Sequence, residues 1–365
     1  MRQTTIFREP GRFGGWPANY GMWRWDDEIV VGFTVGAHKT ISRGHAIDKS
    51  QPVINMQARS LDRGATWQVE EFNGERPDER GLSADEHMAP GRRLSEVMEL
   101  EAVPFPSTPL RFQHPNFALM AARTGLARGV FSFFYVSYDR CRSWGGPYRL
   151  PIFGSTGIAA RTDYIVQGRH SALFFLTANK ADGAEGKVIC VGTEDGGMTF
   201  ELLAEVGGEA PGAGDFAIMP AALALSGNRL LCARRCRDGA NGLSWIDLYA
   251  SDDSGRSWRF LIRPVEFHQR GHSGNPPCLK QLSDGRLLLI YGDRDGPYNI
   301  CARISVDEGI SWSDEIILRS GGANGDMGYV RAVVLDDDSV IAAYYINDHP
   351  DGDGERFIEA TIWQP

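Results

Sequence analysis

The sequence predicts an all-β protein made of repeated antiparallel units, and three observations support this. A phrase with the pattern Ser/Thr-x-Asp-x-Gly-x-Ser/Thr-aromatic recurs along the chain. Its five copies lie at residues 60–67, 137–144, 193–200, 251–258 and 305–312. Segments with strand-like composition flank every copy, and 43 glycines in 365 residues suit a chain rich in turns. We therefore expect a series of similar β units joined by tight turns.

Each copy of the phrase is expected to form a hairpin turn. Asp and Ser/Thr side chains bond nearby backbone N–H groups, and Gly supplies a position with positive φ. The terminal Trp or Phe anchors the turn by burying a large ring. In the second copy Cys141 stands where the others have Gly. The phrase is thus interpreted as scaffold; its aspartates are Asp62, Asp139, Asp195, Asp253 and Asp307.

The phrase resembles the Asp-box (BNR) repeat, and the whole chain resembles the sialidase (neuraminidase) superfamily. This resemblance implies a six-bladed β-propeller of four-stranded antiparallel blades, in one domain spanning residues 1–365. The last four aspartates are 56, 58 and 54 residues apart (195 − 139, 253 − 195, 307 − 253), about one blade each. The first interval, 77 residues (139 − 62), leaves room for an insertion. We assign it to residues 73–93 and expect a charged surface loop.

Six segments are expected to open the blades as inner strands. They are residues 17–25, 115–123, 164 onward, 219–225, 277–282 and 329–335. The sixth blade lacks the phrase, and the chain ends one strand short. Residues 3–8 can supply the missing outer strand, so the N-terminal strand would close the ring and remove its exposed edges.

Composition excludes several classes of function. The net charge of −9, from 38 basic and 47 acidic residues, argues against a nucleic-acid partner. No apolar run is long enough for a membrane helix, and the first residues lead into no signal-type apolar core. Six cysteines without a Cys-x-x-Cys pair suggest buried thiols in a reducing compartment. We expect a cytoplasmic protein, or a secreted or periplasmic one if a leader has been removed.

No cofactor or metal is expected, because the chain has no HExxH motif, Gly-rich phosphate loop or Gly-x-Ser-x-Gly elbow. The sequence assigns no oligomeric partner. Polar residues do gather where the inner strands open, and together they suggest a site of carbohydrate size. They are Asn19, His114, Asn116, Arg161, Asp163, Asp215, His272, Asn275, Asp326, Tyr329 and Arg331. The structural alternative is that many of them tie loops together.

The sialidase resemblance implies roles for individual residues. Sialidases use a Tyr nucleophile, which Tyr329 matches at the opening of the last inner strand. Their acid is a loop Asp, which Asp48 matches, 14 residues before Asp62 (62 − 48). Arg43 and His45 share that loop and would shape the same wall. Arginines grip the substrate carboxylate in sialidases; the matching residues here are Arg235 or Arg234, Arg294 and, in addition, Arg331.

The chain departs from the sialidase pattern at two places. Where sialidases have Arg-Ile-Pro at the first inner strand, this sequence has Gly15-Trp16-Pro17. The Glu that activates the Tyr should precede residues 221–225, and the aligned residue is Met219. Asp215 is the nearest acid and could substitute for that Glu.

The sequence therefore predicts a glycoside hydrolase that cleaves a terminal, acidic sugar from a glycan. Its retaining mechanism would use Tyr329 as nucleophile and Asp48 as acid/base. The carbohydrate is the expected partner, with sialic acid or another acidic or neutral glycan as substrate. Two alternatives stay open: a carbohydrate-binding propeller without catalysis, and a glycan lyase that uses a Tyr/His pair such as Tyr329 and His45.

Overall fold

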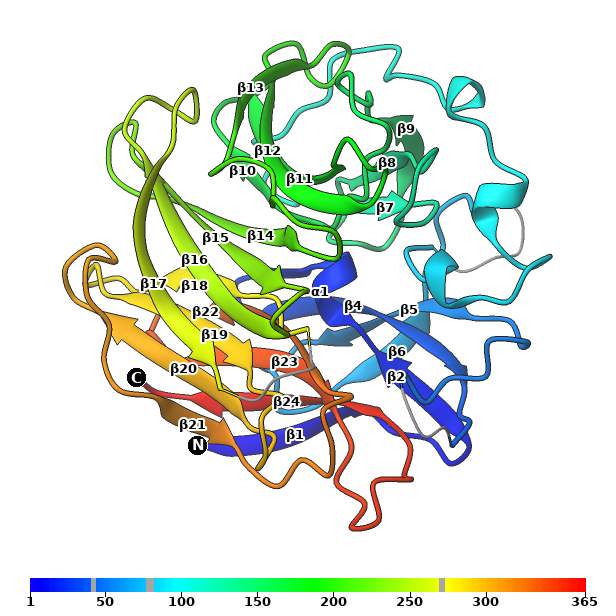
Figure 1. Ribbon diagram of the computed structural model, residues 1–365, viewed down its shortest axis with the longest axis vertical. Coiled ribbons are helices and arrows are strands. Elements are labelled where there is room, and N and C mark those ends of the chain that lie inside the picture. The colour runs from blue at the N-terminus through cyan, green and yellow to red at the C-terminus, as the bar shows by residue number, and fades with distance from the viewer. Residues whose placement is uncertain (41–43, 77–81, 269–272) are drawn as a thin grey trace. The chain divides into compact units, whose positions relative to one another are not determined.

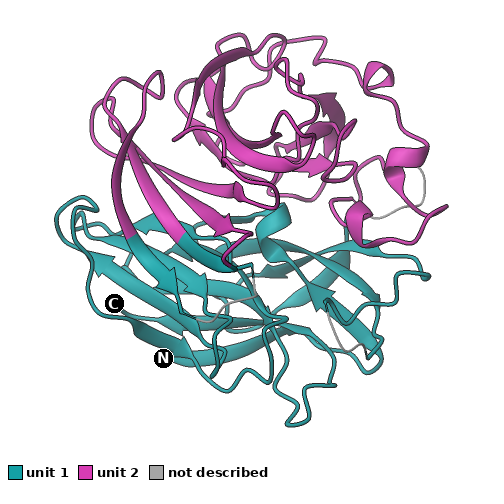
Figure 2. Cartoon of the chain, in the orientation of Figure 1, with its two compact units in different colours: residues 1–72, 242–245, 264–365 teal, residues 73–241, 246–263 magenta. Residues whose placement is uncertain are grey.

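The computed structural model describes residues 1–40, 44–76, 82–268 and 273–365. Its strands form six antiparallel sheets, the blades of a six-bladed β-propeller, so the predicted fold class is confirmed (Figure 1). The chain divides into two compact units (Figure 2). Unit 1 comprises Met1–Phe72, Gly242–Trp245 and Pro264–Pro365, and unit 2 comprises Asn73–Asn241 and Ile246–Arg263.

Unit 1 holds the first, fifth and sixth sheets. The first has the order β2-β4-β5-β6, with β3 also paired to β4; the strands are β2 (Arg12–Gly15), β3 (Met22–Trp25), β4 (Glu28–Ala37), β5 (Ile54–Ser60) and β6 (Gln68–Glu71). The fifth comprises β18 (Cys278–Gln281), β19 (Leu287–Gly292), β20 (Ile300–Ser305) and β21 (Ile316–Arg319). The sixth has the order β1-β24-β23-β22, from β1 (Arg2–Phe7), β22 (Gly328–Val334), β23 (Val340–Ile346) and β24 (Phe357–Trp363).

Unit 2 holds the second and third sheets and most of the fourth. The second comprises β7 (Ala118–Arg123), β8 (Ser132–Ser137) and β9 (Gly145–Arg149). The third comprises β10 (Tyr164–Val166), β11 (Ala172–Asn179), β12 (Glu185–Thr193) and β13 (Glu201–Glu205). The fourth comprises β14 (Phe216–Ala224), β15 (Leu230–Asp238), β16 (Leu243–Ser251) and β17 (Arg259–Phe267).

The N-terminal strand completes the last sheet, as the sequence predicts. Strand β1 pairs antiparallel with β24, with Arg2 opposite Ile362 and Thr5 opposite Glu359. The two termini therefore belong to the same sheet (Figure 1). The backbone groups of β24 that would otherwise form an exposed edge are paired with β1.

The five repeated phrases form five similar turns, which we call the repeat turns. In each, the first Ser/Thr hydroxyl donates to the Asp Oδ1 at 2.8–3.0 Å and accepts the N–H four residues ahead of it at 2.8–2.9 Å. The second Ser/Thr hydroxyl donates to the Asp Oδ2. Cys141 adopts φ 62°, the left-handed conformation that glycine adopts in the other copies. The scaffold role predicted for the phrase agrees with this local bonding.

Two expected inner strands differ from the prediction. Residues 17–25 are not one strand: α1 (Pro17–Tyr20), with Pro at its start, separates β2 from β3. Residues 115–123 do not open the second sheet. In the other four sheets that carry a repeat turn, that turn joins the third and fourth strands. In the second sheet the repeat turn joins β8 and β9, so β8 corresponds to a third strand and β7 to a second strand. The described residues form only three strands in this sheet.

The insertion in unit 2 is longer and less exposed than expected. It runs from β6 to β7 and contains three short 3₁₀ helices, η1 (Asp85–His87), η2 (Leu94–Glu96) and η3 (Leu100–Ala102). Leu82, Ser83 and Ala84 are fully buried, and the Ser83 carbonyl accepts a hydrogen bond from Arg123 of β7. This part of the predicted surface loop is therefore interior, lying beside the sheet that has three strands.

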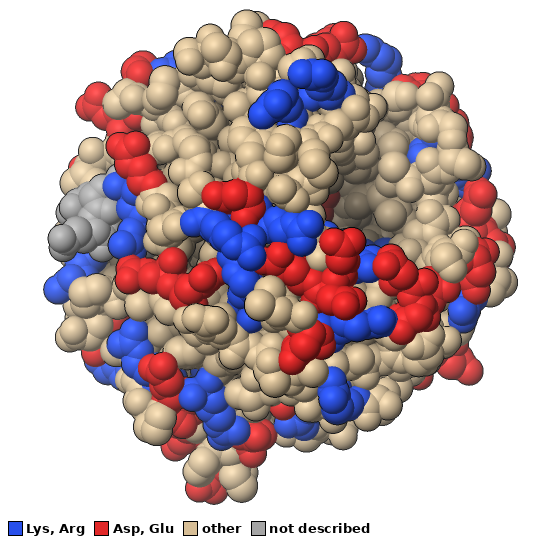
Figure 3. Space-filling view, turned by 180° about the vertical axis from the view of Figure 1, so that it is seen from behind, with Lys and Arg blue, Asp and Glu red and all other residues tan. Residues whose placement is uncertain are grey.

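Apolar side chains fill the space between neighbouring sheets within each unit. In unit 1, Leu288 and Ile290 of β19 pack with Val330 and Tyr344 of the sixth sheet. The six cysteines are buried free thiols. No helix among the described residues has the length and apolarity to cross a bilayer. Acidic and basic side chains are interspersed on the face that Figure 3 shows.

Candidate functional site

A buried carboxylate, Asp326, joins several segments of unit 1. Its Oδ1 lies 2.6 Å from His45 Nδ1, in the β4–β5 loop, and accepts the Tyr345 hydroxyl of β23 at 2.9 Å. Its Oδ2 accepts the Ala46 N–H at 3.0 Å and Arg356 Nε, just before β24, at 2.8 Å. Four hydrogen bonds from three separate segments therefore fix this carboxylate.

The charges around Asp326 decide its protonation. Burial alone would raise its pKa, but the interactions with His45 and Arg356 and the hydrogen bond from the Ala46 N–H outweigh burial and hold the pKa well below its usual value. The pKa of Tyr345 moves the other way, because burial and then the Asp326 charge raise it well above normal. Tyr345 is thus a neutral donor to an ionised carboxylate.

Tyr329 stands next to this cluster in a constrained backbone. It adopts φ 52°, and the register of β22 with β23 shifts between Gly328 and Arg331. The Tyr329 N–H donates to Asn275 Oδ1 at 2.8 Å, while Asn275 Nδ2 donates to the Met327 carbonyl at 3.0 Å. A Cβ at Gly328 would lie 2.4 Å from Asn275, so only glycine fits there. A left-handed conformation in a residue other than glycine is a feature that clusters at functional sites.

The Tyr329 ring contacts an aromatic and a cation. Its centroid lies 5.9 Å from that of Tyr345, edge to face, and the Arg294 guanidinium carbon lies 5.6 Å above the ring. Within the part of the chain that the structure describes, the Tyr329 hydroxyl makes no hydrogen bond. The phenol is therefore available to a ligand.

Arg294 is a buried cation with no acidic partner among the residues that the structure describes. It is 9% exposed, and its nitrogens contact the Met327 carbonyl at 3.2–3.3 Å, with longer 3.5 Å contacts to Ser273 Oγ and the Tyr345 hydroxyl. Among the described residues no carboxylate forms an ion pair with it. A buried guanidinium without a counter-ion is costly unless a ligand supplies one.

The structure thus brings five predicted site residues into one cluster, and two more lie beside the same strand. The five are His45, Asn275, Arg294, Asp326 and Tyr329. Arg331, also on β22, donates from Nη2 to the Ala18 carbonyl of α1 at 2.8 Å. Asn19 follows in α1 and is buried. Arg356 joins the cluster without having been predicted, and no local motif marks it.

Asp48 has its own local partners. Its Oδ1 accepts the Ser50 N–H at 3.0 Å and the Ser50 hydroxyl at 2.7 Å, and Lys39 Nζ lies 3.7 Å away. The Ser50 hydrogen bonds lower its pKa, with Lys39 adding to the effect. Arg43, on the same loop, and His272 lie outside the described residues.

The remaining predicted residues belong to unit 2 and have structural partners there. Asp215 accepts the Gly212 N–H at 2.8 Å and the Gly239 N–H at 2.7 Å, which ties two loops together. Arg161 pairs with Glu185 at 2.7 Å. Arg235 contacts the Met219 sulfur at 3.4 Å and lies over the Phe216 ring. His114 accepts the Asn116 N–H at 3.2 Å.

Met219 occupies a position equivalent to that of Tyr329. Each lies in a strand at one end of its sheet's strand order, each has φ 52°, and each falls within a register shift of that strand. The Met219 N–H donates to Thr177 Oγ1 at 3.0 Å, as the Tyr329 N–H donates to Asn275. The same left-handed backbone conformation, held by a hydrogen bond from the N–H, therefore recurs in unit 2 with an apolar side chain.

A second buried charge cluster lies in unit 2 and was not predicted. Glu86 Oε1 pairs with Arg123 Nη2 at 2.6 Å. Burial acts to raise the Glu86 pKa, but Arg123, His87 and Arg161 lower it to about 2. Burial raises the pKa of the neighbouring Asp85 to about 6, although Ser95 bonds its carboxylate. Both acids line a cavity of about 350 Å³, which residues of the β7–β8 loop also line.

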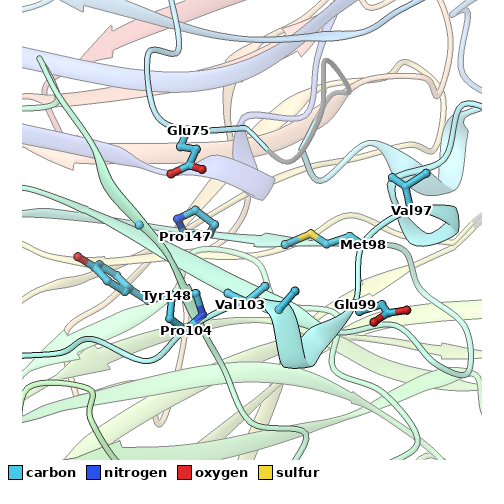
Figure 4. Close-up of a pocket in the computed structure, with 10 residues that line it drawn as sticks. Glu75, Val97, Met98, Glu99, Val103, Pro104, Pro147 and Tyr148 are labelled. Carbon is cyan, nitrogen blue, oxygen red and sulfur yellow. The ribbon is translucent and has the colours of Figure 1, made fainter.

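Another cavity, of about 670 Å³, also lies in unit 2, between the insertion and β9 (Figure 4). Its lining is mostly apolar, including Val97, Met98, Val103 and Pro147. No described residue of the predicted site lines it. Among the described residues no group of three or more His, Cys, Asp or Glu side chains could hold a metal ion.

Comparison with known proteins supports the fold. No model of a protein family matches the chain, and no curated protein matches its sequence. A crystal structure of a protein of unknown function from Dyadobacter fermentans is similar over 99% of this chain and 97% of its own, with 20% identity and a TM-score of 0.72.

Three glycoside hydrolases have the same fold at lower identity. The NanB sialidase of Streptococcus pneumoniae matches 99% of this chain and 70% of its own, at 10% identity and a TM-score of 0.62. The α-L-arabinofuranosidase of Fusarium graminearum matches 100% of this chain and 98% of its own, at 10% identity and a TM-score of 0.61. The chain spans 54% of the length of the Trypanosoma rangeli sialidase, at 13% identity and a TM-score of 0.55. These likenesses establish the propeller.

Proposed function

We propose that the chain is a glycoside hydrolase that removes a terminal acidic sugar from a glycan at the Tyr329 cluster. The observation that carries the proposal is Arg294, a buried guanidinium with no described carboxylate partner, placed over the Tyr329 ring. A sugar carboxylate would supply the missing counter-ion through charge-assisted hydrogen bonds. The propeller fold shared with sialidases and an arabinofuranosidase supports the reaction class by analogy.

In this mechanism Tyr329 acts as the nucleophile of a retaining reaction. Its phenolic oxygen bonds to the anomeric carbon as the glycosidic C–O bond breaks, and the leaving oxygen takes up a proton. Water then attacks the anomeric carbon, and Tyr329 recovers its proton on release. Arg294 would stabilise negative charge that develops on the phenolic oxygen. Asp48 is the acid that the sequence predicts for the proton transfer.

The test is hydrolysis of an aryl-glycoside panel that spans sialosides, uronides and neutral sugars. We expect release from an acidic member, and we expect Tyr329→Phe to abolish turnover while glycan binding persists. Arg294→Met should raise KM for the acidic sugar, because the substrate loses its counter-ion. Binding without turnover of any member by the wild-type chain would instead identify a carbohydrate-binding propeller.

A second candidate function is a glycan lyase, favoured by the His45–Asp326 pair in the same network as Tyr329. A His and a Tyr could remove the proton next to a uronate carboxylate and protonate the leaving oxygen, which eliminates the glycan without water. An unsaturated product that absorbs in the near ultraviolet distinguishes this reaction from hydrolysis.

A further inference from the structure

We propose that His45, oriented by Asp326, transfers the proton at this site. In this assignment His45 protonates the glycosidic oxygen as the bond breaks, and Asp326 is the positioning residue. The inference rests on the proposed hydrolase function and adds the identity of the group that handles the proton. It departs from the sequence prediction, which gives that step to Asp48.

The His45–Asp326 contact defines which ring nitrogen can work. Asp326 is ionised and can only accept, so His45 Nδ1, 2.6 Å away, carries the hydrogen of this bond. Proton exchange with a substrate therefore falls to Nε2. The His45 side chain is 20% exposed and that of Asp326 only 5%. A ligand can thus reach the imidazole, whereas the carboxylate stays inside.

The surroundings hold the pair in one orientation. The Trp16 ring meets the imidazole edge to face, with centroids 5.0 Å apart. Asp326 Oδ2 accepts hydrogen bonds from the Ala46 N–H and from Arg356, and Oδ1 accepts one from the Tyr345 hydroxyl. Arg356 and Tyr345 are thus the charged or titratable groups that, with His45, bond the Asp326 carboxylate. A fixed imidazole avoids the entropy loss that a mobile acid would suffer in the transition state.

The pair is linked to the proposed nucleophile through one residue. Tyr345 donates to the same Asp326 oxygen that faces His45, and its ring is 5.9 Å from the Tyr329 ring. Arg294 contacts both tyrosines. The proton carrier, the nucleophile and the anion-binding cation would thus act on one sugar.

Asp48 is less suited to the step. A general acid must hold its proton until the bond breaks. The Ser50 hydrogen bonds and Lys39 favour the ionised form of Asp48 and lower its pKa. Asp48 already uses Oδ1 to accept two bonds from Ser50.

The proton and electrons balance over two steps. In the first step the imidazolium gives its Nε2 proton to the glycosidic oxygen, which also takes the electrons of the breaking C–O bond. The Tyr329 oxygen bonds to the anomeric carbon and loses its proton to water. Then a water attacks that carbon and gives its proton to the neutral Nε2. The Tyr329 oxygen leaves with the electrons of its bond and is reprotonated from solvent.

The experiment compares two glycosides of the sugar that the panel identifies. One carries 2,4-dinitrophenol, which leaves without protonation, and the other an alkyl alcohol, which needs it. We expect His45→Gln to lower kcat/KM for the alkyl glycoside by about 10²–10⁴-fold and for the dinitrophenyl glycoside by less than about tenfold. Asp326→Asn should show the same split to a smaller degree, which a purely structural role would not produce.

Two further variants complete the design. His349→Gln replaces an exposed histidine of unit 1 that lies 4.0 Å from Asp351, and it should leave both rates unchanged. Exogenous imidazole should restore part of the alkyl-glycoside rate to His45→Ala, which shows that the variant protein is folded.

Three outcomes decide between the residues. Equal losses on both substrates in His45→Gln overturn the inference. A leaving-group split in Asp48→Asn and not in His45→Gln assigns the proton to Asp48 and also overturns it. If the wild-type chain hydrolyses no glycoside, the proposed function itself fails, a result that requires no variant and is therefore distinct.

Discussion

Asp326 in unit 1 and Asp85 in unit 2 are both buried aspartates, yet their pKa values move in opposite directions. Asp326 is paired with His45 and Arg356, and these interactions hold its pKa well below normal. Asp85 is bonded by the N–H groups of Leu94 and Ser95 and by the Ser95 hydroxyl, and burial raises its pKa to about 6. Burial favours the neutral acid in both residues, and only the charged partners of Asp326 turn its pKa shift from upward to downward.

The difference separates a carboxylate held by neutral hydrogen-bond donors from one held by ionisable partners. Asp85 fixes η2 against η1, a task that neutral donors perform. Asp326 keeps a full negative charge inside the protein and directs it at a partly exposed histidine. Buried charge of this kind is expensive, so it is a better indicator of function than burial or acidity alone.

The largest expected effect is the loss of stability when the arginine beside a buried carboxylate is removed, Arg123 beside Glu86 or Arg356 beside Asp326. Arg123→Met removes the direct ion-pair partner of the buried Glu86 and leaves it His87 at 3.6 Å and the charge of Arg161, whereas Arg356→Met leaves Asp326 with His45, Ala46 N–H and Tyr345. We expect a loss of about 3–5 kcal/mol in the free energy of unfolding for Arg123→Met and a smaller loss for Arg356→Met. Urea unfolding at pH 7 measures both. Equal losses would show that the remaining partners of Asp326 add no stability.

The next effect is the pH dependence due to Asp85. Its pKa is about 6 in the folded protein against 3.8 for the free group, so the folded state binds more protons between those values. Stability from this residue is therefore full below pH 3.8 and is lost as the pH rises toward 6. The loss is on the order of 3 kcal/mol, from about 2 pKa units.

Asp85→Asn should remove this part of the pH dependence. Unfolding by urea at several pH values between 4 and 7 tests it, with Asp252→Asn, an exposed carboxyl of unit 2, as control. For Asp326 the sign is opposite, because a lowered pKa gives stability that disappears on acidification. If Asp85→Asn kept the wild-type pH profile, the contrast between the two aspartates would be lost.

A smaller effect distinguishes two buried tyrosines. Tyr345 donates to the Asp326 carboxylate at 2.9 Å and Tyr135 to the Glu75 backbone carbonyl at 2.7 Å. A hydrogen bond to a charged group is worth about 1.5–3 kcal/mol and a neutral one about 1 kcal/mol. Tyr345→Phe should therefore destabilise the protein more than Tyr135→Phe does. Thermal unfolding at pH 7 ranks them, and the reverse order would contradict the ionised state of Asp326.

The smallest effect concerns Asp48, which extends the comparison to a partly exposed aspartate. Its low pKa comes first from the Ser50 hydrogen bonds. Ser50→Ala removes the hydroxyl and should move the Asp48 pKa upward, with little change in melting temperature. Carboxyl NMR titration follows it directly. An unchanged Asp48 titration would mean that Lys39 or the Ser50 N–H sets the pKa.

The sequence by itself determined the repeating scaffold. Each repeat turn is bonded between residues at most four positions apart, such as Ser60, Asp62 and Gly64, so the pattern is visible in the letters. The closing role of the N-terminal strand also followed, because the last unit lacked one strand. The sequence likewise marked Tyr329, Asn275 and Asp326 by their place at strand openings, and Arg294 by the sialidase resemblance.

Only the tertiary structure decided which of these residues meet and in what charge state. His45 and Asp326 are 281 residues apart, and Arg356, which helps to keep Asp326 ionised, carries no motif. The sequence could not tell that Asp215 ties two loops or that residues 82–85 are buried. Local hydrogen bonds leave a periodic trace in a sequence, whereas ion pairs between distant loops depend on how sheets place those loops in space.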